Sequence, residues 1–468
     1  MQSYTNQKLK NLHLFIVIGV VYALLISCAK DNDPVVIIPP SVPKLDEIFD
    51  ISKVTRITIE ISTVEWNRLL TCFDINSANE EYVLADFNID GSNSDIDLDS
   101  IGIRIRGNTS RRRPEGNEGE PHNQIAPDWH HAHYALNFKK YRKNQRFNNL
   151  EKINLKWFKD DANYVREVYC YDLFERFGVW TAPKSSYCLL TIKIKEDDKS
   201  AYFGVYQMIE SIDEDYVVNR ANSFTGTDGN LWKCSYGASL RYPDRDRMGV
   251  EDITLNPNTV QTFIYDLKTN KKELEPAKDE LASFISDFKA KSGVAFKNWV
   301  SGKIDVPLLL RTYAVNVMVG MWDDYWANNN NYYMYFDTDG KFYFIPYDYD
   351  NTLGTSLLMD SGTQDFLNWG NPNNPLIKKI INFPEYKALY VGYLRELVNA
   401  EKDLFYAPSS MARIENWQNM IRQNVPNDTG EDMSIDDYPA NWANRPQYRL
   451  NDLTNNFYVI RSANLPPL

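Results

Sequence analysis

Residues 321–354 constrain the fold of this chain more than any other stretch of its sequence. The apolar run 308–322 predicts a buried helix, which leads into Asp323 and Asp324 and then a tract of four asparagines. Two short aromatic segments follow, 332–336 and 342–345, and the Asp-Gly pair between them is typical of a β-hairpin turn. The sequence therefore predicts a helix that ends beside a hairpin.

A second acidic turn, PYDYDNTLG at 346–354, follows this hairpin. Because a hairpin returns the chain to its starting edge, we expect Asp348 to lie near Asp323 and the asparagines. Carboxylate and amide oxygens suit a hard divalent cation such as Mg²⁺, which leaves its other positions to water and phosphate. The order of Asp323, Asn328 and Asp348 also follows that of a phosphoryl-transfer site. The alternative is that Asp and Asn only fill turns.

Several segments resemble those of the CotH (spore-coat protein H) kinase family, whose members are secreted and have an atypical protein-kinase-like fold. Besides the two acidic turns, they are IRGNTS at 105–110, DANYVREVYCYDLFERFG at 161–178 and FGVYQMIESID at 203–213. The resemblance implies an α+β, two-lobed, kinase-like domain at 51–468. Its β-rich lobe would cover 51–212, and its helical lobe, with a helical C-terminal extension, would cover 213–468.

The resemblance also implies roles for the two acidic turns. Asp323 would orient the attacking hydroxyl as catalytic base, with Asp324 as the alternate because the doubled aspartate blurs the alignment. Asp348 would be the principal metal ligand, and Asp350 a second candidate. Three extra residues relative to the family's usual spacing leave two candidates open for the amide ligand, Asn328 and Asn331.

Further residues are candidates for contacts with a nucleotide. The loop after the predicted strand 101–106 offers amides and hydroxyls to a phosphate, from Gly107, Asn108 and Ser110. The family usually has a lysine pair before the next strand, which this chain lacks, so Lys139, inside the predicted strand 134–140, is the substitute. The resemblance also places Arg166 at the site and Glu210 at the hinge beside the base. The alternative for the loop is a plain turn. The alternative for Arg166 is a surface ion pair, and the alternative for Glu210 is a carboxylate at a helix start.

The first 28 residues have the features of a bacterial lipoprotein signal peptide. Two lysines precede an apolar run at 12–26, and LISC at 25–28 resembles a lipobox, so we expect lipidation of Cys28. A transmembrane anchor is the alternative, but the run is short for a span of ~20 residues. The next residues resemble the acidic export tag of surface lipoproteins in Bacteroidetes-type bacteria, and 29–50 forms a proline-rich linker. We therefore expect an outer-membrane lipoprotein, at the periplasmic or the outer face.

Composition restricts the partners. The formal charge of −12 argues against nucleic acid and favours a neutral or basic protein substrate. The cysteines after Cys28 show no CxxC spacing, so a zinc knuckle is not expected, and Cys170 and Cys188 lie in apolar runs typical of buried thiols. The histidine-rich segment 122–133 is either a transition-metal site or a polar loop.

These observations predict a kinase that transfers the γ-phosphate of ATP to protein Ser or Thr, with Mg²⁺ or Mn²⁺ as cofactor. Because ATP is scarce outside the cytoplasm, the main alternative is a kinase-like surface binding module without turnover, such as an adhesin or a partner in glycan capture. A third possibility is a divalent-cation hydrolase of phosphate esters, for which the sequence shows no distinct water-activating base.

Overall fold

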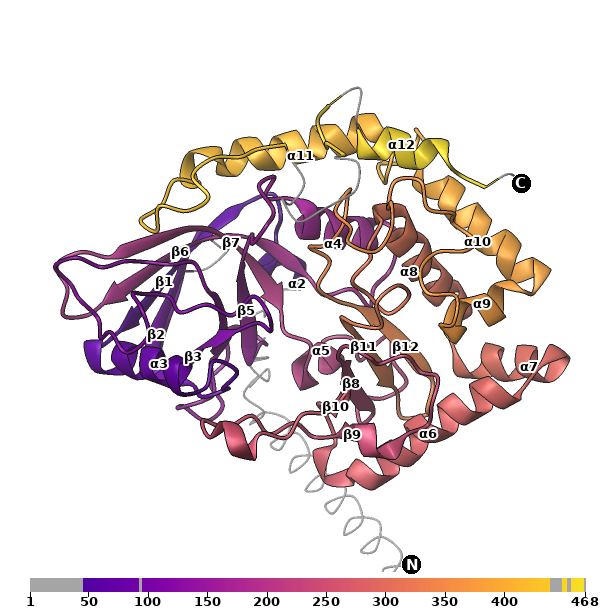
Figure 1. Cartoon of the computed structure of the whole chain (residues 1–468), viewed down its shortest axis with the longest axis horizontal. Coiled ribbons are helices and arrows are strands. Elements are labelled where there is room, and N and C mark those ends of the chain that lie inside the picture. The colour runs from indigo at the N-terminus through magenta and orange to yellow at the C-terminus, as the bar shows by residue number, and fades with distance from the viewer. Residues whose placement is uncertain (1–44, 92–94, 438–447, 453–455, 467–468) are drawn as a thin grey trace, which may run out of the picture. The chain divides into compact units, whose positions relative to one another are not determined.

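The computed structural model describes residues 45–91, 95–437, 448–452 and 456–466 (Figure 1). The chain divides into the units Met1–Val42 and Pro43–Leu468, and only the second is described below. The predicted signal peptide, Cys28 and most of the proline-rich linker lie outside the described residues. In the described part of the chain, no helix is both long and apolar enough to cross a membrane.

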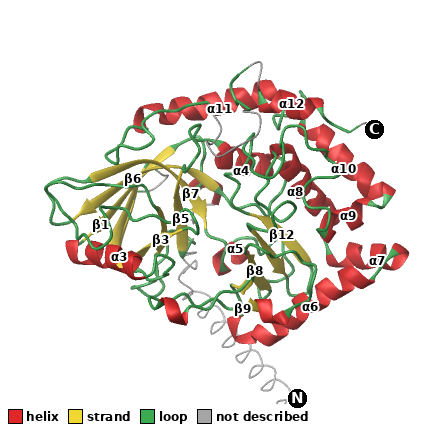
Figure 2. Ribbon diagram, viewed as in Figure 1, coloured by secondary structure: helices red, strands yellow, loops and turns green. Residues whose placement is uncertain are grey.

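The N-terminal part of this unit is a closed barrel with the strand order β1-β2-β3-β4-β5-β7-β6 (Figure 2). Its neighbouring strands are antiparallel except β1 and β6, whose parallel pairing closes the barrel. Alternating burial along β1 shows that one face of the strand fills the interior. The barrel strands are β1 (Val54–Ile61), β2 (Val83–Asp90), β3 (Ile96–Arg106), β4 (His133–Asn137), β5 (Lys152–Trp157), β6 (Ser185–Ile194) and β7 (Ala201–Glu210).

A second sheet has the order β12-β11-β8-β10-β9. The predicted hairpin is confirmed: β11 and β12 pair antiparallel, with Tyr333 opposite Ile345. On its other side β11 pairs with β8, where Lys233 stands opposite Tyr333, and β8 in turn pairs with β10. The strands are β8 (Asn230–Cys234), β9 (Met248–Gly249), β10 (Tyr265–Leu267), β11 (Tyr332–Phe336) and β12 (Phe342–Pro346).

Helix α8 (Val306–Val319) is the predicted buried helix before the acidic turn. Nearly all of its side chains are buried, as expected for a helix that is apolar on every face. Asp305 caps its start by accepting a hydrogen bond of 3.1 Å from the N–H of Leu308. The prediction that it continues to residue 322 is wrong, because Gly320 adopts a left-handed φ of 69° that ends the helix. Asp323 therefore lies in the loop that follows.

The other helices surround the two sheets, and the structure as a whole is of the mixed α+β class. The C-terminal extension is helical as expected and contains α9 to α12. The prediction of a helix over 445–460 is wrong for 448–452, which are not helical, and α12 begins only at Phe457. The remaining bounds are α2 (Leu45–Ile48), α3 (Thr63–Ile75), α4 (Arg166–Arg176), α5 (Glu214–Val218), α6 (Leu274–Ala290), α7 (Gly293–Lys303), α9 (Pro375–Ile381), α10 (Pro384–Leu397), α11 (Ala407–Ile421) and α12 (Phe457–Ala463), with 3₁₀ turns at Arg245–Arg247, Pro257–Thr259, Lys271–Glu273 and Arg422–Asn424.

Candidate functional site

Three carboxylate side chains surround the ammonium group of one lysine. Nζ of Lys156, on β5, lies 2.7 Å from Glu167 Oε2, 2.6 Å from Asp348 Oδ1 and 3.0 Å from Asp350 Oδ2. We call these four residues the lysine–carboxylate cluster. The side chains of Lys156 and Glu167 are buried, whereas those of the two aspartates are partly exposed. The cluster therefore has a closed side in the protein and an open side toward solvent.

Glu167, in the first turn of α4, fixes the turn that carries Asp348. Its Oε1 accepts hydrogen bonds from the hydroxyl of Tyr171, at 3.0 Å, and from the N–H of Tyr349, at 3.1 Å. The N–H of Asp348 donates in turn to the Tyr171 hydroxyl. Asp348 has a φ of 63°, a left-handed conformation that is strained for a residue with a side chain. The hydrogen bonds around Glu167 hold it there.

The charges in the cluster shift the pKa of its members in opposite directions. Burial works to raise the pKa of Asp348, but the ammonium of Lys156 and the guanidinium of Arg106 outweigh it and bring the pKa below its usual value. Burial raises the pKa of Asp350 to about 8, and Oδ1 of this residue is buried without a hydrogen-bond partner in the described part of the chain. Asp348 is therefore the more acidic carboxylate of the pair.

Asp323 sits among asparagine side chains. Its Oδ1 accepts hydrogen bonds from Nδ2 of Asn328, at 2.6 Å, and of Asn330, at 3.2 Å, and its Oδ2 accepts one of 3.1 Å from Asn331. Burial raises the pKa of Asp323, and the negative charge of Asp348 adds to this rise. Both candidate amide ligands thus contact the carboxylate of Asp323, which itself lies within electrostatic reach of Asp348.

Asp324 has a different place in the same loop. Its side chain is buried, and its Oδ1 accepts a hydrogen bond of 2.9 Å from the N–H of Ala327. Its carbonyl oxygen accepts from the N–H groups of Asn328 and Asn330 at 3.0 Å. Burial raises its pKa to about 7. In this geometry Asp324 shapes the loop, and Asp323 is the carboxylate that faces the other site residues.

The loop that the sequence predicts to bind phosphate, Gly107 to Ser110, directly follows Arg106, which contacts the acidic turn. Arg106, the last residue of β3, donates to the hydroxyl of Tyr347, which directly precedes Asp348. Gly107 has a φ of 116°, and a Cβ there would lie 2.7 Å from Oγ of Ser110. Arg111 closes the loop by donating a hydrogen bond of 2.7 Å to the carbonyl oxygen of Gly107. The loop is therefore tight and is anchored beside the lysine–carboxylate cluster.

The chain matches a known protein family over most of its length. The family model of the CotH kinase protein matches residues 103–455, which include every residue of the cluster. The chain belongs to this family. It is similar to Invasin CotH3 of Rhizopus delemar, with 23% identity over 296 residues, which is 60% of this chain and 44% of that protein. It is also similar to Spore coat protein homolog 1 of the same organism, with 21% identity over 304 residues, or 58% of this chain and 44% of that protein. The chain thus spans less than half the length of these relatives.

In this CotH protein, three residues predicted from the resemblance lie in other networks. The prediction that Lys139 lies inside a strand is wrong, since β4 ends at Asn137 and the ammonium of Lys139 pairs with Glu151. Arg166 is fully buried and pairs with Asp161. Glu210 is also fully buried, and its two carboxylate oxygens accept hydrogen bonds of 2.7 Å from the guanidinium group of Arg220.

Sequence reasoning did not select the two residues that close the CotH site, Lys156 and Glu167. Lys156 lies within EKINLKW, which carries a strand signal and no motif. Glu167 follows Arg166 directly within a segment that resembles the family. The signal that was present is a lysine within a strand, together with a carboxylate in the first turn of the next helix.

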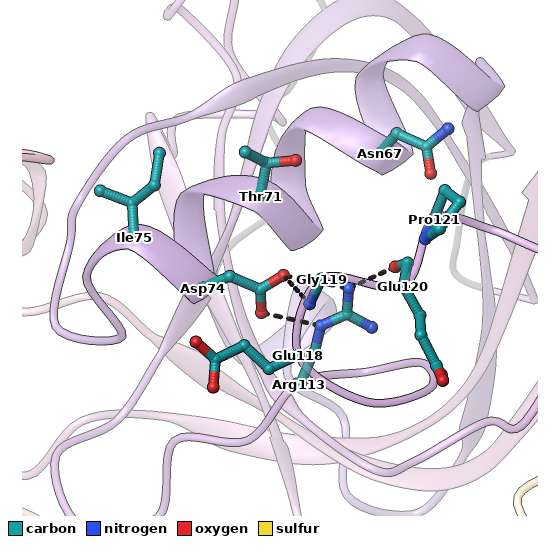
Figure 3. Close-up of a pocket in the computed structure, with 9 residues that line it drawn as sticks. All are labelled: Asn67, Thr71, Asp74, Ile75, Arg113, Glu118, Gly119, Glu120 and Pro121. Carbon is teal, nitrogen blue, oxygen red and sulfur yellow. Dashed lines mark hydrogen bonds and ion pairs between the residues drawn. The ribbon is translucent and has the colours of Figure 1, made fainter.

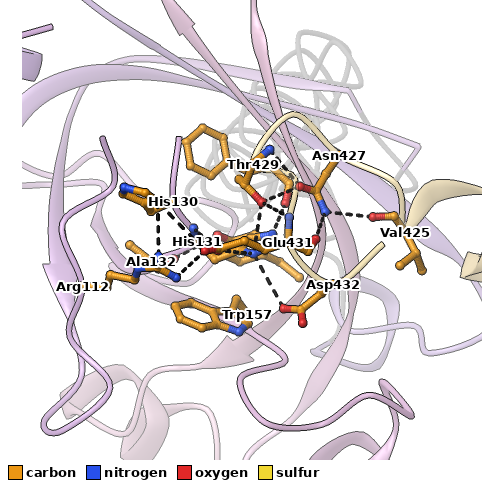
Figure 4. Close-up of polar contacts among 12 residues, drawn as sticks. Arg112, His130, His131, Ala132, Trp157, Val425, Asn427, Thr429, Glu431 and Asp432 are labelled. Atoms are coloured by element: carbon orange, nitrogen blue, oxygen red, sulfur yellow. Dashed lines mark hydrogen bonds and ion pairs between the residues drawn. The ribbon is translucent and has the colours of Figure 1, made fainter. Parts of the chain in front are cut away.

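Two other charged segments, the loop 113–121 and the histidine-rich segment, form contacts within the protein. Figure 3 shows the pocket between α3 and the loop 113–121, where Nε of Arg113 donates to Oδ1 of Asp74 at 2.9 Å. His131 contacts Glu431 (Figure 4), and its Nδ1 lies 3.2 Å from Oε2 of that residue. The other ring nitrogen of His131 lies 2.8 Å from the carbonyl oxygen of Phe203. Within the described residues, no group of three His, Cys, Asp or Glu side chains is arranged to hold a metal ion. His131 and His133 are buried, and His133 is the first residue of β4. The transition-metal interpretation of the histidine segment stays a prediction.

The four cysteines of the described chain are all free and buried, and they are Cys72, Cys170, Cys188 and Cys234. This agrees with the expectation of buried thiols for Cys170 and Cys188. Burial raises the pKa of both thiols, so neither is a reactive thiolate at neutral pH.

Proposed function

We propose that this CotH protein is a protein kinase that transfers the γ-phosphate of ATP to Ser or Thr of a protein substrate. The observation that carries the proposal is the contact of Lys156 with both Glu167 and Asp348, at 2.7 Å and 2.6 Å. A neutral or basic substrate surface would suit the net charge of −12.

The arrangement corresponds to the parts that phosphoryl transfer requires in protein kinases. There, a lysine on a strand pairs with a glutamate on the following helix, and an aspartate after a later strand holds the metal ion. Here Lys156 lies on β5, Glu167 lies on the following helix α4, and Asp348 comes directly after β12. In this proposal Lys156 takes the phosphate-binding role that the sequence suggested for Lys139.

The donor set suits Mg²⁺ or Mn²⁺. Asp348 and Asp350 supply carboxylate oxygens, Asn328 or Asn331 supplies an amide oxygen, and hard cations prefer such ligands with water and phosphate completing the shell. The unpartnered Oδ1 of Asp350 is consistent with a ligand that is satisfied on cation binding. When bound, the cation would neutralise charge on the phosphates. The three carboxylates of the cluster now converge on Lys156, so cation binding requires the aspartates to turn from Nζ.

Asp323 is the proposed base for the substrate hydroxyl. Burial raises its pKa, which strengthens it as a proton acceptor while its three asparagine contacts fix its orientation. The loop from Gly107 to Ser110, with its small side chains, would leave the phosphates close access to backbone N–H groups.

The decisive experiment measures transfer of labelled phosphate from ATP, with Mg²⁺ or Mn²⁺, to the protein itself and to a generic protein substrate. We expect incorporation by the wild type and none by Asp348→Ala, with Asp339→Ala, in the hairpin turn, as the matched control. No incorporation by the wild type, together with no metal-dependent rise in melting temperature on adding ATP, would overturn the kinase proposal.

A surface binding module is the second candidate, because two of the similar proteins carry the names Invasin CotH3 and Invasin CotH7. For such a module, Asp348→Ala would leave ligand affinity intact. Either function would be carried out at the cell envelope if Cys28 is lipidated as its sequence context suggests. Cys28→Ser should then move the protein from the outer-membrane fraction to the soluble fraction, and an unchanged distribution would reject the lipid anchor.

A further inference from the structure

Three cations beside the cluster have no carboxylate partner among the described residues. They are Arg106 and Arg111, at the two ends of the phosphate loop, and Lys233 on β8. The carboxylates nearby are already engaged: Glu80 pairs with Arg104 at 2.9 Å, and Asp266 and Glu251 flank Lys268. The region between β3 and the second sheet therefore holds three cations that form no ion pair among the described residues, although the protein as a whole is acidic.

Lys233 is placed toward the site by the register of the sheet. It stands opposite Tyr333 on β11 and Asp266 on β10, so these side chains share one face. The ring of Tyr333 lies 5.1 Å from that of Tyr347, whose hydroxyl accepts the hydrogen bond from Arg106. Lys233 thus stands on the face of the sheet that continues toward Asp348.

The two arginines are held in position by neutral groups. Arg111 donates to the carbonyl oxygens of Gly107, Ser77 and Asn79, at 2.7 to 2.9 Å. Arg106 donates to the hydroxyl of Tyr347. These contacts orient both guanidinium groups without neutralising their charge.

Burial disfavours this charge. It lowers the pKa of Lys233, with the charge of Lys268 adding to the effect, and it lowers the pKa of Arg111 to about 10. At Arg106, burial is outweighed by the electrostatic effect of Tyr347 and Asp348, which raises the pKa. Partly buried cations gain more electrostatic stabilisation from a bound anion than exposed cations do. A chain of phosphates has the charge and the length to contact more than one of them.

We infer that Lys233, Arg106 and Arg111 bind the phosphate chain of the nucleotide, with Lys233 as a second lysine that contacts phosphate opposite Lys156. The inference rests on the proposed function and extends it, because it places the phosphates between the barrel and the β8–β12 sheet. Lys156 comes from the barrel side and Lys233 from the sheet side, so the phosphates would join the two sheets through ionic contacts.

The test uses inorganic tripolyphosphate as a probe, because it carries the phosphates without the base. Its affinity is measured by calorimetry for the wild type, Lys233→Met, Lys233→Arg and Lys272→Met, an exposed lysine after β10 that serves as the control. We expect Lys233→Met to weaken binding by about tenfold or more, as for loss of a charge-assisted contact, with partial recovery in Lys233→Arg. Lys272→Met should bind as the wild type does. Urea denaturation of each variant shows that folding is retained, since Lys233 has no ion pair to lose.

The outcomes separate this inference from the kinase proposal. Equal tripolyphosphate affinity for the wild type and Lys233→Met, or no binding by the wild type, would overturn the inference even if phosphate transfer occurs. Weakened binding in Lys233→Met without any phosphate transfer by the wild type would support the anion site and reject the kinase.

Discussion

The N–H of Tyr349 donates a hydrogen bond of 3.1 Å to Oε1 of Glu167, although 182 residues separate the two in the sequence. The other oxygen of the same carboxylate lies 2.7 Å from Nζ of Lys156. One buried side chain therefore joins helix α4, strand β5 and the turn that carries Asp348. This arrangement makes the site depend on the packing of α4 against the acidic turn.

Glu167→Ala should lower the free energy of unfolding by on the order of 3 kcal/mol, because it removes a buried partner of Lys156 and two hydrogen bonds. Glu167→Gln should cost less, since its amide oxygen can still accept from Tyr171 and Tyr349. Urea denaturation measures both, with Glu175→Ala on the exposed face of the same helix as the control. Equal losses for Glu167→Ala and Glu175→Ala would contradict the assigned role.

Lys156→Met should reduce phosphate transfer by about 100-fold or more, because it removes the cation placed between helix α4 and Asp348. Lys139→Met should leave transfer near the wild-type rate, since Lys139 pairs with Glu151 instead. The measurement is the initial rate of incorporation at saturating ATP and Mg²⁺. A larger loss in Lys139→Met than in Lys156→Met would reverse the assignment.

His122 should make the stability of the barrel depend on pH. Burial opposes its charged form, but hydrogen bonds to Glu115 and Asp197, at 2.9 and 3.0 Å, outweigh it and raise the pKa of His122 above 6.5. A raised folded-state pKa contributes stability that is complete below about pH 6.5 and is lost as the pH rises through the folded-state value.

The free energy of unfolding is measured in urea between pH 5.5 and pH 8.5. For the wild type it should fall as the pH rises by an amount that is missing in His122→Gln. The comparison of the two proteins isolates this residue from the other titrating groups. Parallel pH profiles for the wild type and His122→Gln would rule out the contribution.

Gly320→Ala should destabilise the protein by about 1–3 kcal/mol, because the residue has a φ of 69° and its Cβ would lie 2.9 Å from Cβ of Ser361. Gly302→Ala is the matched control: no atom lies within 4 Å of its Cβ position, and it belongs to helix α7. It should be neutral or stabilise by up to about 1 kcal/mol. Thermal melting compares the two, and a melting temperature for Gly320→Ala at or above that of Gly302→Ala would show that the helix end tolerates a side chain.

Local signals in the sequence determined a large part of the fold. The hairpin β11–β12 followed from alternation and an Asp-Gly turn. The start of α3 also has a local signal, since Oγ of Ser62 accepts a hydrogen bond from the N–H of Glu65. The end of α8 was placed too late because the apolar run continues past Gly320, although the glycine itself was the stop signal.

The same local signals identified the acidic turns, but they did not identify Lys156, the cation that contacts Asp348 and Asp350. Asp323, Asp348 and the asparagines stand out because oxygen-rich turns at the ends of regular elements are visible in a single segment. Lys156 does not stand out, since its role depends on contacts with Glu167 in the next helix and with Asp348, 192 residues away in the chain.

The tertiary structure also decided which partners the other candidate residues have. Lys139 and Glu210 were candidates by position, and their partners Glu151 and Arg220 come from the folded chain. Burial of a charge is costly unless an opposite charge or a hydrogen-bonding group meets it, and which groups meet is set by the packing of distant segments. The sequence by itself therefore determined the two acidic turns, whereas only the folded chain determined that Asp348 and Asp350 meet Lys156.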